Sequence, residues 1–159
     1  MSEAAVHSIN VSDGGVPKRP RPRVEVRVGG LEGDRQADRR HHGGPDRAVS
    51  LYSLELIEAL RREGHPIEPG SIGENLTLSG LDWEAVRPGT TLEVGEAMLE
   101  VVRPAEPCRK IAGAFRNGGF VRVSEQANPG WSRFYARVLR EGAVGVGDRV
   151  VCRPGPGLS

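Results

Sequence analysis

Only one of the two cysteines in this sequence of 159 residues stands in a setting that favours chemistry. Cys108 follows Pro107 and precedes the cationic pair Arg109 and Lys110. Positive charge beside a thiol favours the thiolate, which is the nucleophilic form and a soft ligand for transition metals. Cys108 is therefore the candidate catalytic and metal-binding residue. The alternative is an inert surface or core cysteine.

The other cysteine, Cys152, alternates with Val150 in a pattern typical of a strand, and we interpret it as core packing. Two cysteines make no disulfide framework, and the cytosol keeps thiols reduced. The first six residues hold neither a basic segment nor an apolar run, and no stretch reaches the ~20 apolar residues of a membrane span. These features predict a cytoplasmic protein that makes no membrane contact.

Long polar loops hold most of the other residues that could bind a ligand. Long loops without secondary structure are usually functional in a small domain. The candidate binding residues, in chain order, are Lys18, Arg35, His42, Gly43, Gly73, Asn75 and Arg109. If a barrel brings these loops to one rim, they form a basic pocket with several hydrogen-bond donors and one thiol. The glycines permit positive φ and a close approach of the backbone.

Other kinds of site have weaker support in the sequence. His41 and His42 are adjacent, and neighbours rarely ligate one ion, so a zinc site would need scattered further ligands. No GxGxxG or P-loop pattern supports nucleotide binding. The net charge of +1 gives no global field that would attract nucleic acid. The basic residues are nearly all arginines, which reflects either composition bias or selection for binding anions.

Short strands are the main elements that position these loops. Val24, Val26 and Val28 alternate with charged residues, which predicts a half-buried strand. Less regular patterns predict further strands over residues 6–11, 76–78, 91–94, 97–102, 143–146 and 149–152.

Two helices are expected beside these strands. Leu54, Ile57 and Leu60 share one stripe behind Ser53, a suitable N-cap, and predict a helix that ends near Gly64. A second helix is predicted over residues 131–140, with Trp131, Phe134 and Val138 facing inward.

The strand count predicts a mainly β fold (mixed β/α), a small closed β-barrel with two or more peripheral helices. We expect one domain over residues 6–152, a flexible N-terminus over residues 1–5 and a flexible tail over residues 153–159.

Read in order, the loop sequences resemble the MOSC family, the domain at the C-terminus of molybdenum cofactor sulfurases that also occurs as free-standing bacterial proteins. The ordered set is specific, although each piece alone is weak. The matching pieces are Gly15–Lys18, Gly30–Arg35, His42–Gly44, Asp46–Val49, Gly70–Leu76, Pro107–Cys108, and Glu141–Gly142 through Gly147–Asp148.

This resemblance implies a barrel-like mixed fold, a pterin-based molybdenum cofactor (molybdopterin), and metal or sulfur chemistry at Cys108. Charge-assisted hydrogen bonds from Lys18, Arg35 and Arg109 would suit the phosphate of the cofactor, and Asn75 would suit its pterin ring. Within the family the chain is similar to small bacterial proteins that reduce N-hydroxylated bases such as 6-hydroxylaminopurine. It differs from the related amidoxime-reducing enzymes in lacking a separate N-terminal subdomain.

Three functions follow from these expectations. The first is a molybdenum-dependent reductase of small N-hydroxylated compounds. It would need a separate electron-donor protein of the flavoprotein or ferredoxin type, because the sequence has no flavin, haem or iron–sulfur motif. The second is a cofactor or sulfur carrier that relays sulfur as a Cys108 persulfide. The third is a pyridoxal-phosphate or anion-binding barrel, with Lys18 as the Schiff-base candidate.

Overall fold

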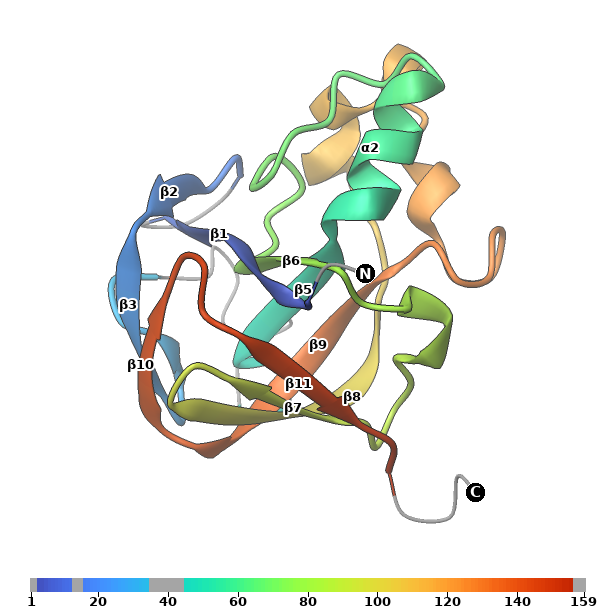
Figure 1. Cartoon of the computed structure of the whole chain (residues 1–159). Helices are drawn as coiled ribbons and strands as arrows, with labels where there is room; N and C mark the ends of the chain where they lie inside the picture. Colours follow the sequence, from blue (N-terminus) through green and yellow to red (C-terminus); the bar gives the residue numbers. More distant parts are fainter. Residues whose placement is uncertain (1–2, 13–15, 35–44, 156–159) are drawn as a thin grey trace.

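The computed structural model describes residues 3–12, 16–34 and 45–155, and within them the chain consists mainly of β-strands (Figure 1). The strands are β1 (Ala5–Val11), β2 (Arg19–Arg21), β3 (Arg23–Arg27), β4 (Gly30–Leu31), β5 (Val49–Ser53), β6 (Leu76–Ser79), β7 (Thr91–Val94), β8 (Ala97–Ala105), β9 (Arg133–Arg140), β10 (Gly142–Gly145) and β11 (Val150–Arg153). The helices are α2 (Leu54–Arg62) and the short 3-10 helices η1 (Pro45–Arg47), η2 (Trp83–Ala85), η3 (Arg109–Ala114), η4 (Arg116–Gly118) and η5 (Phe120–Val123). The predicted mainly β class is confirmed.

Eight strands form one curved sheet in the order β11-β7-β8-β9-β5-β6-β1-β2, while β10, β3 and β4 form a second sheet. Backbone hydrogen bonds join the start of β1 to the segment entering β11. The amide of Val6 donates to the carbonyl of Asp148, and the amide of Val150 donates to the carbonyl of Ala4, both at 2.9 Å. Strand pairing leaves β11 and β2 as the ends of the sheet, and these bonds bring the start of β1 next to β11 without a continuous ladder between them.

The predicted first helix is confirmed as α2, which connects the parallel neighbours β5 and β6. Ser53 caps it, because its Oγ accepts a hydrogen bond from the amide of Leu56 at 3.2 Å. Ile57 and Leu60 are buried against the sheet. Strand β5 itself was not predicted, because all five of its residues are buried and the sequence therefore shows no alternation.

The predicted helix over residues 131–140 is wrong, because residues 133–140 form strand β9. Strand β9 lies between β8 and β5, and both of its faces are covered near its start, because consecutive residues there point to opposite faces and are both buried. Arg133 and its neighbour Phe134 are both buried, which removes the period of two that marks a half-buried strand. The spacing of Trp131, Phe134 and Val138 then imitates a helical stripe.

Strand β1 begins one residue before the predicted domain start at residue 6, and β11 ends one residue after the predicted end at residue 152. Of the helices in the described ranges, none has the length and apolar character required to cross a bilayer.

Candidate functional site

The segment that leads into β2 lies against the loop that leads into β6. The amide of Lys18 donates to the carbonyl of Gly70 at 2.9 Å. Gly73 has a φ of 82°, and a Cβ added there would lie 2.8 Å from Cγ1 of Val16. A side chain at this position would meet both a clash and left-handed backbone strain, so glycine is required. The two segments are therefore fixed against each other.

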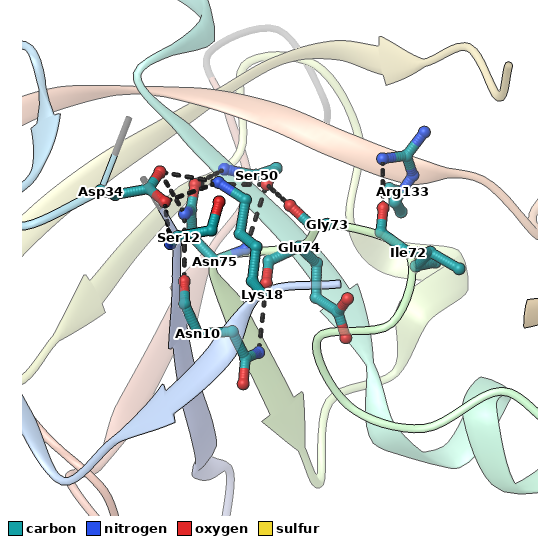
Figure 2. A network of polar contacts seen from close by, with 10 residues as sticks. All are labelled: Asn10, Ser12, Lys18, Asp34, Ser50, Ile72, Gly73, Glu74, Asn75 and Arg133. Atoms are coloured by element: carbon teal, nitrogen blue, oxygen red, sulfur yellow. Dashed lines mark hydrogen bonds and ion pairs between the residues drawn. The ribbon is translucent and has the colours of Figure 1, made fainter. Parts of the chain in front are cut away.

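Arg133 joins the loop before β6 to the loop that carries Cys108. It starts β9, opposite the last residue of β8. Its Nη1 donates to the carbonyl of Ile72 at 2.8 Å, and its Nη2 donates to the carbonyl of Glu106 at 3.3 Å. Figure 2 shows the first of these bonds. The fold thus gathers three segments that are far apart in the sequence.

A carboxylate that was not predicted as a site residue lies at the centre of a polar network (Figure 2). Asp34 Oδ1 accepts hydrogen bonds from the amide of Ser12 at 2.9 Å and from Lys18 Nζ at 2.8 Å. Its Oδ2 accepts from Lys18 Nζ at 2.7 Å and from Asn75 Nδ2 at 2.8 Å. The Lys18 and Asp34 side chains are only 7% and 5% exposed. A charged pair so far from water needs such surrounding hydrogen bonds.

The amide group of Asn75 is used at both ends within the chain. Its Oδ1 accepts from the amide of Ser50 at 2.9 Å and from the hydroxyl of Ser50 at 3.2 Å. Its Nδ2 donates to Asp34 and, at 3.3 Å, to the carbonyl of Asn10. Lys18 and Asn75, both predicted to bind the cofactor, are therefore bound to Asp34 in this structure.

Glu74 is fully buried and holds the loop before β6 from within. Its Oε2 accepts from the amide of Gly70 at 3.0 Å and from the hydroxyl of Thr77 at 2.9 Å. Its Oε1 has no partner among the described residues. Burial raises the pKa of the Glu74 carboxyl, and these hydrogen bonds and the charge of Arg133 oppose that rise.

Cys108 is half-buried and has extended backbone, with φ −140° and ψ 173°, immediately before η3. Its carbonyl accepts from the amide of Ile111 at 3.1 Å, which fixes the turn behind the thiol. The neighbouring Arg109 and Lys110 are exposed. Neither side chain forms an ion pair with another described residue. The thiol therefore lies beside two cations that no carboxylate of the described chain neutralises.

Cys152 lies on β11 opposite Leu92 and packs against the core, as its alternation with Val150 predicts. Burial raises the pKa of its thiol, and the charge of Asp82 adds to the effect. Both changes disfavour the reactive thiolate at this position.

Three predicted binding residues, Arg35, His42 and Gly43, lie outside the described residues, as does His41. In the part of the chain that the structure describes, no group of three or more His, Cys, Asp or Glu residues is arranged to hold a metal ion. Asp34 and Arg133 are the site residues that sequence reasoning missed. Asp34 stands in one of the matching pieces and could have been found there, whereas Arg133 was hidden by the wrong helix.

Comparisons with known proteins identify relatives of the chain. A family model described as MOSC domain matches residues 38–151. The uncharacterized protein YflK of Bacillus subtilis (strain 168) is 40% identical over 138 residues, which are 84% of this chain and 60% of that protein. A protein of Gibberella moniliformis named reductase is 33% identical over 128 residues, 76% of this chain and 22% of that protein. The chain thus spans less than two thirds of the length of these curated relatives.

A solved structure supports the same relationship. The crystal structure of YiiM from Geobacillus stearothermophilus superimposes with a TM-score of 0.72 at 29% identity, covering 94% of this chain and 75% of that chain.

Proposed function

The chain belongs to the MOSC domain family, and from this premise we propose that it binds a molybdenum cofactor and reduces N-hydroxylated compounds such as N-hydroxylaminopurines and amidoximes. One observation carries the proposal. Cys108 is half-buried and next to the exposed Arg109 and Lys110, and it stands two residues after Glu106, whose carbonyl Arg133 joins to the loop before β6. The relative named a reductase supports the reaction class.

The donor groups of these loops are of the kinds that such a cofactor needs. A dithiolene-bound molybdenum needs one further soft, anionic ligand, and the Cys108 thiolate is of that kind. The phosphate of the cofactor suits Arg109 and Lys110, whose charges no described carboxylate occupies. Lys18 Nζ has three N–H groups and gives two hydrogen bonds to Asp34, so among the described residues one N–H is left for a ligand.

Both ends of the Asn75 amide group are already engaged, because Ser50 bonds its oxygen and Asp34 and Asn10 accept from its nitrogen. We therefore keep Lys18 and Arg109 as proposed cofactor-binding residues and assign Asn75 to shaping the loop. Arg35, His42 and Gly43 stay proposals from the family motif.

The cofactor, when bound, supplies the two-electron redox chemistry. Reduction of an N-hydroxylated amine consumes two electrons and two protons, breaks the N–O bond, and yields the amine and water. The chain would contribute the Cys108 sulfur as the metal ligand, and Arg109 and Lys110 would contribute cations that attract anionic groups. The buried Lys18–Asp34 pair keeps two of the surrounding segments in place.

The electrons would come from a separate donor protein of the flavoprotein or ferredoxin type, because the sequence itself has no flavin, haem or iron–sulfur motif. Charge around the thiol supports an acidic donor. Residues 103–122 hold five basic residues and one acidic residue, a net charge of +4, which the pairing of Arg122 with Glu63 at 2.8 Å reduces to +3, whereas the whole chain has +1. Complementary charge steers such an encounter and raises its rate.

Metal analysis of protein from a cofactor-competent host tests the ligand assignment. We expect molybdenum in the wild type, almost none in Cys108→Ser, and an unchanged content in the matched control Cys152→Ser. The same preparations are assayed with 6-hydroxylaminopurine and an amidoxime, using a chemical reductant as the donor. Equal molybdenum in both serine variants would remove the ligand assignment. Molybdenum-loaded protein that reduces neither substrate with any donor would remove the reductase.

A cofactor or sulfur carrier is the second candidate, favoured by the partial exposure of the free Cys108. A carrier would bind cofactor without turnover and would gain one sulfur atom on Cys108, visible by intact-mass measurement. The pyridoxal-phosphate alternative loses support. A Schiff base requires a neutral amine, whereas Lys18 Nζ lies at 2.7 Å from an oxygen of Asp34 as an ion pair.

A further inference from the structure

Arg133 is a charged residue that the fold almost seals from water. It is 7% exposed, and its Nε is buried with no hydrogen-bond partner among the described residues. No carboxylate of the described chain forms an ion pair with it, and the buried Glu74 carboxyl interacts with its charge only from a longer distance. Burying a guanidinium in this way lowers the stability of the fold unless its hydrogen bonds compensate for the lost hydration. The hydrogen bonds of Arg133 go to carbonyls of two loops, so they stabilise the contact between these loops.

The second of these carbonyls is close to Cys108 along the chain. Arg133 Nη2 holds the carbonyl of Glu106, and Pro107, with its fixed φ, is the only residue between Glu106 and the cysteine. On the other side, the Cys108 carbonyl accepts from the amide of Ile111. The backbone that carries the thiol is therefore anchored on both sides.

The first carbonyl belongs to a loop that is itself held rigidly. Arg133 Nη1 holds Ile72 at 2.8 Å, while Glu74 in the same loop holds the amide of Gly70. The hydroxyl oxygen of Ser50 in turn accepts a hydrogen bond from the backbone amide of Asn75. Arg133 therefore connects the Cys108 loop to a segment that is itself anchored by several hydrogen bonds.

We infer that Arg133 is a positioning residue, which fixes the Cys108 loop against the loop before β6 and so controls the access of other groups to the thiol. This inference goes beyond the proposed function. It concerns the chain without any cofactor, and it would hold for a reductase and for a sulfur carrier alike.

The two cysteines make a selective test possible. Iodoacetamide alkylates a thiol when the thiolate sulfur displaces iodide, and mass spectrometry reports the rate at each cysteine of the full chain. In Arg133→Met the loop loses both donors, while an unbranched apolar side chain still fills the part of the space nearest the backbone. Losing charge-assisted hydrogen bonds shifts a local opening equilibrium by about tenfold, so we expect alkylation of Cys108 to accelerate about tenfold while Cys152 keeps its rate.

The matched control is Arg137→Met on the same strand. Arg137 is half exposed and pairs with Glu100 at 2.8 Å, far along β9 from the loops, so both cysteines should keep their wild-type rates. Hydrogen exchange provides a second local measure. In Arg133→Met, peptides over residues 69–75 and 104–110 should exchange faster, and the β7–β8 hairpin should not.

Two results would overturn the inference. One is a Cys108 rate in Arg133→Met within about twofold of the wild type, with unchanged exchange in both loops. The other is an equal acceleration of both cysteines, because that marks general destabilisation. If Arg133→Met does not fold, Arg133→Gln replaces it. Its neutral amide has one donor nitrogen in place of the two that bond the carbonyls, so the same selective acceleration of Cys108 is expected.

Discussion

Replacing Asp34 with alanine tests whether the buried ion pair organises the site. The change removes the acceptor of hydrogen bonds from Ser12, Lys18 and Asn75. It also leaves the Lys18 ammonium, 7% exposed, without its counter-ion. Breaking a buried pair by removing one partner costs about 3–5 kcal/mol. We expect the free energy of unfolding to fall by about 4 kcal/mol, since the two neutral donors also lose their acceptor.

Replacing the other partner, Lys18, should lower the free energy of unfolding by less. In Lys18→Met the carboxylate of Asp34 still accepts from Ser12 and Asn75, so we expect a loss of about 2 kcal/mol. The double variant leaves no orphaned charge. Its loss should be smaller than the sum of the two single losses by at least about 1 kcal/mol, because the residues are in direct contact. Arg27→Ala is the surface control: its pair with Glu32 has side chains 58% and 63% exposed, and we expect about 0.5 kcal/mol or less.

Urea unfolding followed by circular dichroism and tryptophan fluorescence measures these losses, with coincident transitions as the check for two-state behaviour. For a chain of this size, 4 kcal/mol corresponds to a fall in Tm of about 8–16 °C. The reasoning is refuted if Asp34→Ala loses less than about 1 kcal/mol, or if the losses of the single variants add up in the double variant.

Two further predictions concern the loop before β6. The raised pKa of Glu74 means that the folded state binds the proton of this carboxyl more tightly than the unfolded state does. The free energy of unfolding should therefore fall as the pH rises above 4.5, the ordinary pKa of the carboxyl. Urea unfolding from pH 4 to 9 should show this fall in the wild type and a flatter profile in Glu74→Gln, while parallel profiles would contradict the assignment. Gly73→Ala should lose about 2–4 kcal/mol from φ strain and the clash with Val16, whereas Gly130→Ala, with φ 89° and open space, should lose only about 1–2 kcal/mol; equal losses would disprove the clash.

Elements with one face in the core were predictable from the sequence. In β3, Val24 and Val26 are buried while the residues between and beside them are exposed, so alternation identified the strand. The helix α2 carried both a stripe and a capping serine at Ser53. In each case the information lies within a few neighbouring residues, which is where sequence patterns are reliable.

Elements covered on both faces were not predictable in this way. Strand β5 is buried throughout, and the start of β9 combines buried Arg133 with buried Phe134. A buried arginine is uncommon, and it breaks the apolar pattern of a central strand. The same feature that caused the wrong helix therefore hid the residue that joins the Cys108 loop to its neighbour.

At the candidate site, the sequence likewise indicated which residue types are present but not which residues pair with one another. The sequence identified Lys18 and Asn75 as polar loop residues, but it could not show that both meet Asp34, which is 41 positions from Asn75. The pairing changes the electrostatics of the predicted basic pocket. Most of the positive charge of Lys18 is neutralised by a buried counter-ion, so attraction for an anionic group falls mainly to Arg109, which lies beside the thiol and has no such partner among the described residues.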